Sequence, residues 1–198
     1  MYKICRTEQS AKRQREIEEA LLRLMNKRKY EEISIIELCE ESGVPRKAFY
    51  RYFDNKEAAL QALIDHTLTG YEDFVKAKAV KKKQRRLSDD LEHFFLFWSY
   101  KREFLTAIDK NGLLHNLVTA SMNFPVNDII STRRFIPGES DWMRGQIFQF
   151  AICGMMFTMI DWFRRGFSES THEMARSTCR MLSRPLFPDL EELGILSE

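Results

Sequence analysis

The residues best suited to chemistry lie in the segment GVPRKAFYRYFDNKEAAL, at positions 43–60. On a helix that turns 100° per residue, this segment would place its phenylalanines on one face and its cationic side chains on another. Arginine and lysine donate hydrogen bonds to base edges and phosphates, so an outward basic face of this kind suits the major groove of DNA. The outward residues are Arg46, Lys47, Tyr50 and Arg51, and the inward ones are Phe49 and Phe53, with Tyr52 beside them.

A preceding short helix is needed to hold that face in position. Ser34 and Glu37 form a capping box, which predicts a helix from about Ile35 to Glu41. Gly43 can close this helix in the left-handed conformation, and Pro45 suits the first turn of the next one. Two short helices joined by a tight glycine turn indicate a helix-turn-helix. The same pattern is also typical of an ordinary solvated surface, so spacing alone leaves both readings open.

The flanking sequence predicts helices throughout. The chain of 198 residues contains only eight glycines and five prolines, and its apolar residues recur at intervals of three and four. One apolar stripe precedes the helix-turn-helix and another follows it. The first comprises Ile17, Ala20, Leu21, Leu24 and Met25, and the second Ala59, Leu60, Leu63, Ile64, Thr67 and Tyr71.

Composition narrows the class of protein. With 44% hydrophobic and 30% charged residues, and a net charge of +2, the chain reads as a soluble globular protein without a global basic field. Its four cysteines show no CxxC spacing, which favours a reducing, cytoplasmic location. The longest apolar stretch, 151–160, is too short to cross a bilayer, so we expect no membrane partner.

An enzyme is not expected. The four histidines are dispersed and form neither HxxxH nor HExxH, and the sequence contains no glycine-rich phosphate loop or serine elbow. We therefore predict no catalytic residue, no metal site and no cofactor. The histidines are His66, His93, His115 and His172.

Residues 34–60, SIIELCEESGVPRKAFYRYFDNKEAAL, resemble the DNA-binding signature of TetR-family transcriptional regulators. The resemblance implies that Arg46 and Lys47 reach base edges, and Pro45, Arg51 and Tyr52 are further candidate DNA-binding residues. It assigns Tyr50 and Lys56 to backbone phosphates, and Ser34 to both a helix cap and a phosphate. Three positions depart from the usual pattern: Pro45 in place of Ser or Thr, Tyr52 in place of histidine, and Cys39 in place of alanine.

The second part of the chain is rich in bulky apolar side chains. The segment LEHFFLFWSYKREFL carries more aromatic surface than one buried stripe needs, although a single aromatic residue at helical spacing is more often core. The resemblance implies a regulatory body that binds an inducer, an unknown small-molecule effector. Candidate pocket residues are Phe94, Phe97, Trp98, Phe104 and Phe150.

The segment QIFQFAICGMMFTMIDWFRRG is apolar almost all the way round, so both of its sides must be covered. Together with an amphipathic helix over Thr171–Leu182, it predicts a two-helix unit that pairs with its copy as a four-helix bundle. The resemblance implies the same arrangement. Candidate interface residues are Phe150, Gly154, Phe157, Thr158, Asp161, Met174, Thr178 and Met181.

The sequence as a whole predicts an all-α protein with a three-helix DNA-binding head at residues 1–56. A linking helix follows at 57–80, and a helical-bundle domain for ligand binding and dimerisation at 81–198. We expect a homodimer that binds a palindromic operator in double-stranded DNA and is most simply a ligand-responsive repressor. The alternative is a dimeric DNA-binding regulator that answers to a protein partner or to no ligand.

Overall fold

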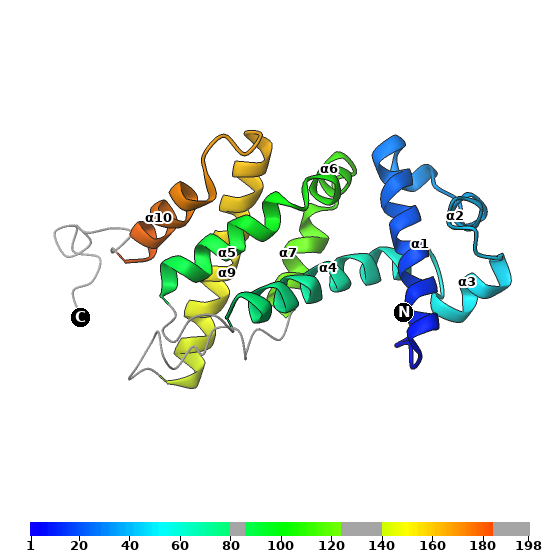
Figure 1. The fold of residues 1–198 in the computed structure, drawn as a ribbon, viewed down its shortest axis with the longest axis horizontal. Helices are drawn as coiled ribbons and strands as arrows, with labels where there is room; N and C mark the ends of the chain where they lie inside the picture. The colour runs from blue at the N-terminus through cyan, green and yellow to red at the C-terminus, as the bar shows by residue number, and fades with distance from the viewer. Residues whose placement is uncertain (80–85, 124–139, 184–198) are drawn as a thin grey trace. The chain divides into compact units, whose positions relative to one another are not determined.

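The computed structural model describes residues 1–79, 86–123 and 140–183 (Figure 1). These residues form α-helices joined by short turns, with one 3-10 turn and no strand, so the all-α expectation is confirmed. The elements are α1 (Glu8–Lys27), η1 (Tyr30–Glu32), α2 (Ile35–Ser42), α3 (Arg46–Tyr52), α4 (Lys56–Ala79), α5 (Leu87–Ser99), α6 (Arg102–Lys110), α7 (Leu114–Asn123), α9 (Asp141–Arg164) and α10 (Thr171–Leu182).

Local sequence signals set the ends of the helices in the helix-turn-helix. The Ser34 side chain accepts a hydrogen bond from the backbone N–H of Glu37, and the Glu37 carboxylate accepts one from the backbone N–H of Ser34, which is the predicted capping box at the start of α2. Gly43 then adopts the left-handed conformation with φ of 65°, which ends α2. Pro45 precedes α3 without any side-chain cap, as expected where a Ser or Thr is missing.

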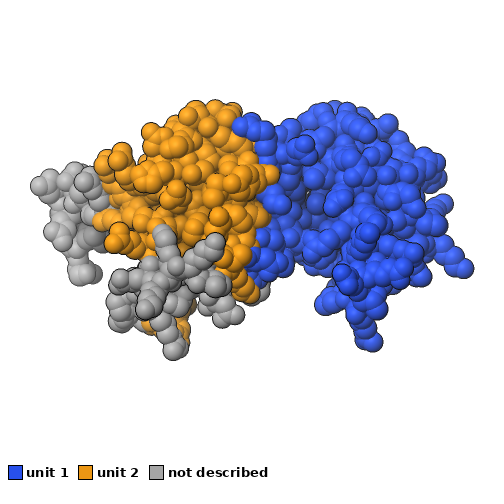
Figure 2. Space-filling view, viewed as in Figure 1, with its two compact units in different colours: residues 1–73, 101–128 blue, residues 74–100, 129–198 orange. Residues whose placement is uncertain are grey.

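The chain divides into two compact units (Figure 2). Unit 1 comprises Met1–Asp73 and Lys101–Asp128, and unit 2 comprises Phe74–Tyr100 and Ile129–Glu198. The division differs from the contiguous domains expected from sequence, because α6 packs against α1. The end of the predicted linking helix at residue 80, and the start of the body at residue 81, lie outside the described residues.

Asn111, directly after α6, explains why α6 belongs to unit 1. Its amide nitrogen donates to the carbonyl oxygen of Met25 at 3.1 Å, and its oxygen accepts from the backbone of Tyr30 at 2.6 Å. Lys110 adds a hydrogen bond to the carbonyl oxygen of Asn26 at 3.1 Å. Residues more than 80 positions apart in the sequence are thereby joined at the end of α1.

In unit 2, aromatic rings form the core between α5, α9 and α10. Trp162 of α9 lies edge-on to Phe95 of α5, with 5.4 Å between the ring centroids. The indole N–H of Trp162 donates to the carbonyl oxygen of Glu169 at 3.0 Å, so this buried polar group is satisfied. α10 presents Met174 and Ala175 to the same core.

Helix α9 is long and apolar enough, with a mean hydropathy of 1.2 over an 18-residue window, to meet the length and composition of a membrane span. Only 22% of that window is buried within the protomer. The same composition is found in a helix of a soluble protein that packs against its own core on one face and against a partner on the other, because both faces are then in apolar surroundings.

Candidate nucleic-acid interface

Helix α3 presents the two faces that its spacing predicts. Phe49 and Phe53 are fully buried, and their ring centroids lie 5.4 Å apart. These buried rings hold a helix of only seven residues against the rest of unit 1, because so short a helix would not be stable alone. The opposite face is exposed and consists of Arg46, Lys47, Tyr50 and Arg51.

A shallow hollow of about 590 Å³ lies along this exposed face, which we call the α3 hollow. It is lined by Lys47, Tyr50 and Arg51 of α3, by Arg13 and Glu16 of α1 and by the turn around Gly43. The Arg46 guanidinium lies 5.9 Å from the centroid of the Tyr50 ring, within the range of a cation–π contact. The surface therefore combines cations with an exposed phenol, which suits contacts to both phosphate and base edges.

The cap at Ser34 combines with an ion pair at the start of α2. Glu37 accepts hydrogen bonds from the Ser34 backbone and hydroxyl and from the Arg28 guanidinium, and these interactions lower the pKa of the Glu37 carboxyl. Because this pKa is lowered in the folded state, the contribution of Glu37 to stability is present at neutral pH and is lost as the pH falls through that lowered value. Ser34 itself is exposed, so its position also permits the predicted phosphate contact.

We expect Ser34→Ala to lower the free energy of unfolding by about 1 kcal/mol, because the first turn of α2 loses its cap. The pKa of Glu37, followed by NMR titration, should rise toward its ordinary value. Ser170→Ala is the matched control, since Ser170 and Glu173 form the same capping box on α10. Only Ser34→Ala should also weaken DNA binding, and an equal loss of DNA affinity in both variants would contradict the role of Ser34 at the interface.

Tyr52 differs from the other predicted DNA contacts. It is only 6% exposed, because α3 turns this side chain toward α1 and the N-terminal segment. The Arg51 guanidinium lies 5.7 Å from the centroid of its ring. Tyr52 thus offers DNA little surface, and its visible role is to support Arg51.

Lys56 makes several contacts within the protein, and its phosphate contact stays a prediction. Its amine donates hydrogen bonds to three backbone carbonyl oxygens, those of Tyr30 at 2.6 Å, Ile33 at 2.8 Å and Glu31 at 3.2 Å. A lysine has three N–H donors, so all of them are engaged. The amine also lies 4.3 Å from the centroid of the Tyr30 ring. These contacts tie the start of α4 to the segment that precedes α2.

The N-terminal segment, residues 1–6, was not predicted as part of the interface. Its Lys3 backbone N–H donates to the carbonyl oxygen of Tyr52 at 2.9 Å, and Tyr2 forms an isolated antiparallel bridge with Phe53. Six residues without apolar periodicity give no helix or strand signal, so only the positions of Lys3 and Arg6 in the sequence could have hinted at a basic arm. We refer to residues 1–6 as the arm.

The predicted pocket residues lie in separate surroundings. Phe94, Phe97 and Trp98 of α5 are buried in unit 2, where Phe97 and Trp98 pack edge-to-face with 5.3 Å between ring centroids. Phe104 is buried in unit 1, on α6. Phe150, in contrast, is 66% exposed on α9. The ligand pocket remains a prediction.

The predicted dimer residues fall into two groups. Met174 and Thr178 are buried within the protomer, because this face of α10 packs on α5. The residues on α9 form an outward stripe at alternating intervals of three and four, which is the spacing of a helix-packing seam. The stripe, which we call the α9 stripe, comprises Met143, Ile147, Phe150, Gly154, Phe157 and Asp161. Thr158 is half-buried beside it, and Met181 of α10 is 45% exposed.

No group of three or more histidine, cysteine, aspartate or glutamate side chains suited to a metal ion occurs in the part of the chain that the structure describes. The departure at Cys39 concerns packing, since this residue is buried and burial raises the pKa of its thiol. The chemistry of the site is therefore that of cations, hydroxyls and backbone amides.

Comparison with known proteins agrees with this geometry. Residues 17–63 match the sequence model of a family described as bacterial regulatory proteins, tetR family. This match covers the second half of α1, the helix-turn-helix and the first turns of α4. The chain is also 35% identical over 77 residues to the HTH-type transcriptional regulator EthR of Mycolicibacterium smegmatis, a match that covers 37% of this chain and 35% of that protein. The similarity therefore spans about a third of that relative.

Solved structures resemble the fold over most of its length. The fatty acid degradation regulator FadR from Bacillus halodurans aligns with a TM-score of 0.62 at 12% identity, covering 87% of this chain and 95% of that one. A TetR transcriptional regulator from Streptococcus agalactiae aligns with a TM-score of 0.62 at 16% identity, covering 89% of this chain and 96% of that one. At these identities the alignments support the fold and carry no information on the ligand.

Proposed function

Because the chain belongs to the TetR family of bacterial regulatory proteins, we propose that it is a homodimeric repressor that binds a palindromic operator and is released by a small molecule. The observation that carries this proposal is the exposed basic face of α3, held by the buried rings of Phe49 and Phe53. Lys47 and Arg46 read base edges in the major groove, and Tyr50 and Ser34 bind the backbone.

Two copies of α3 are needed because one short helix makes few base contacts. A two-fold dimer brings two such helices to half-sites about one helical turn apart, or a multiple of it, and thereby multiplies specificity. The α9 stripe supplies an apolar surface of the kind that pairs in a helical bundle. In such a dimer the two DNA-binding heads can be spaced to fit the operator or spaced so that they do not fit it. An effector bound in the body would act only by binding one of these two arrangements more tightly than the other.

A second candidate keeps the DNA-binding dimer and replaces the small molecule by a protein partner or by no effector. The close packing of Phe94, Phe97 and Trp98 in unit 2 favours it, since rings that fill a core leave less room for a ligand. Release of the protein from its operator by small molecules, screened with the operator in hand, separates the two candidates.

The test of the DNA-binding proposal is selection from randomised duplex DNA at near-physiological salt, where simple phosphate attraction does not dominate. We expect enrichment of a palindrome by the wild-type protein. Lys47→Ala should relax base preference at a position in each half-site, at a cost of about 1–3 kcal/mol for the preferred base. Tyr50→Phe should instead weaken operator and random DNA alike. Enrichment of no motif by the wild-type protein would overturn the proposal.

A further inference from the structure

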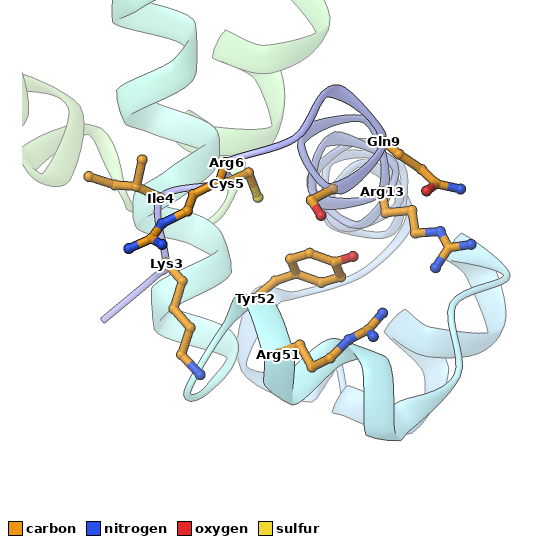
Figure 3. A pocket seen from close by; sticks show the side chains of 9 residues that line it. Lys3, Ile4, Cys5, Arg6, Gln9, Arg13, Arg51 and Tyr52 are labelled. Carbon is orange, nitrogen blue, oxygen red and sulfur yellow. The ribbon is translucent and has the colours of Figure 1, made fainter.

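A second hollow, of about 400 Å³, lies between the arm, the start of α1 and the end of α3 (Figure 3). We call it the arm hollow. Four of its lining side chains are cations, and the described residues that line it include no carboxylate. Lys3 and Arg6 come from the arm, Arg13 from α1 and Arg51 from α3, with the ring of Tyr52 between them.

The backbone of the arm is attached to the rest of unit 1 by hydrogen bonds. The Gln14 side chain, which is only 3% exposed, donates to the carbonyl oxygen of Lys3 at 3.2 Å and accepts from the Cys5 thiol at 3.1 Å. The Tyr2 hydroxyl donates to Asp65 of α4 at 2.9 Å. Together with the backbone contacts to Tyr52 and Phe53, these bonds attach the arm to α1, α3 and α4.

Three of the four cations of the arm hollow have no ion-pair partner among the described residues. Within residues 1–79, 86–123 and 140–183, Arg6, Arg13 and Arg51 form no ion pair with a carboxylate. The Lys3 amine points to the last turn of α3, where it lies 3.5 Å from the carbonyl oxygen of Tyr50. Like charges gathered in one place repel each other, and an anion among them would remove that repulsion.

The position of the hollow indicates the source of the anion. The arm hollow and the α3 hollow share Arg13 and Arg51, and the α3 hollow also contains Lys47 and Tyr50. The two hollows adjoin through these shared residues, so cationic side chains extend from the recognition residues to the arm, with the carboxylate of Glu16 also lining the α3 hollow. A duplex lying along α3 would carry its phosphates over this surface, because DNA presents one negative charge per roughly 1.7 Å of its axis.

We propose that the arm hollow binds a backbone phosphate of the operator, beside the base pairs that α3 reads. This inference rests on the proposed function and adds a site to it. A phosphate in the arm hollow can accept hydrogen bonds from the forked donors of Arg13 and Arg51. The Lys3 and Arg6 side chains, which lie on the other side of the Tyr52 ring (Figure 3), add positive charge around it. The arm hollow therefore contributes affinity and register without reading sequence.

The test is the salt dependence of DNA binding by Arg6→Ala. This side chain is exposed and the variant should fold normally, which thermal unfolding checks. The slope of log K against log salt concentration should decrease by about 1, with an equal loss of affinity on operator and random DNA. Arg6→Lys should retain most of the slope, and the selected motif should not change.

Arg15→Ala is the charge-matched control, since Arg15 is exposed on α1 but points about 160° away from Arg13 and does not line the hollow. Equal slopes for Arg6→Ala and Arg15→Ala would overturn the assignment. Calorimetry with inorganic phosphate in the absence of DNA tests whether the hollow binds a free anion. Tight phosphate binding that needs Arg6, together with an unchanged salt slope of DNA binding in Arg6→Ala, would assign the hollow to a free anion instead. Failure of the wild-type protein to select any motif would count against the proposed function itself.

Discussion

Replacing Phe157 by aspartate should convert the proposed dimer into monomers and abolish the tight operator binding proposed for it. Phe157 is 63% exposed in the protomer although it lies in the middle of an apolar helix, so a partner surface is the simplest environment for it. Burial of one phenylalanine side chain contributes about 1.5–3 kcal/mol, and a two-fold interface buries two. We therefore expect the dissociation constant of the dimer to rise by roughly 10²–10⁴-fold.

Sedimentation velocity over a range of protein concentrations measures this effect directly. Tyr100→Asp is the control, because Tyr100 is also an exposed ring, at 70%, but lies outside the α9 stripe. An unchanged dimer in Phe157→Asp would remove the α9 stripe from the interface. Operator affinity should fall as dimerisation is lost. Weak binding to random DNA should persist, since each DNA-binding head keeps its cationic side chains.

Gly154 provides a second view of the same face. A Cβ atom at this position would meet no atom within 4 Å in the protomer, so a larger residue can be accommodated without strain. Gly154→Leu should therefore stabilise the isolated helix, since glycine is the poorer helix former. If two copies of α9 approach closely at this glycine, the same change should weaken the dimer. A gain in the free energy of unfolding together with a loss of dimer affinity would therefore identify an effect on the interface and not on the fold.

The sequence predicted those features that depend on neighbouring residues. The capping box at Ser34, the left-handed Gly43 and the helix over Thr171–Leu182 all follow from signals within a few positions, and the structure confirms them. The two faces of α3 follow equally from its period. Local chemistry sets these features, so little knowledge of the tertiary structure is needed.

The features that the sequence could not predict depend on contacts between distant segments. Lys56 binds a carbonyl oxygen 26 positions away, and no local pattern distinguishes such a lysine from one that faces solvent. Met174 and Thr178 are buried because they lie on the face of α10 that packs on α5. Which face of α10 packs there depends on α5, a segment distant in the sequence. The arm lacks periodicity altogether, and its order comes from Gln14, Tyr52 and Asp65.

Lys56→Met should destabilise unit 1 as well as weaken DNA binding. The methionine keeps most of the apolar stem but removes all three donors, which leaves the carbonyl oxygens of Tyr30, Glu31 and Ile33 without this partner. A hydrogen bond from a charged group contributes about 1.5–3 kcal/mol, and the half-buried position of Lys56 reduces that value through solvent screening. We expect the free energy of unfolding to fall by about 2–3 kcal/mol.

Lys47→Met is the control that distinguishes the structural role of Lys56 from a phosphate contact. It removes one positive charge from an exposed lysine on α3, and its effect on unfolding should stay within about 0.5 kcal/mol. Chemical denaturation of both variants, paired with the salt slope of DNA binding, gives the comparison. A Lys56→Met protein that is as stable as the wild type but loses about 1 from the slope would restore the phosphate role implied by the family resemblance. A loss of stability with little change in slope would make Lys56 a positioning residue, which keeps the start of α4 against the segment that caps α2.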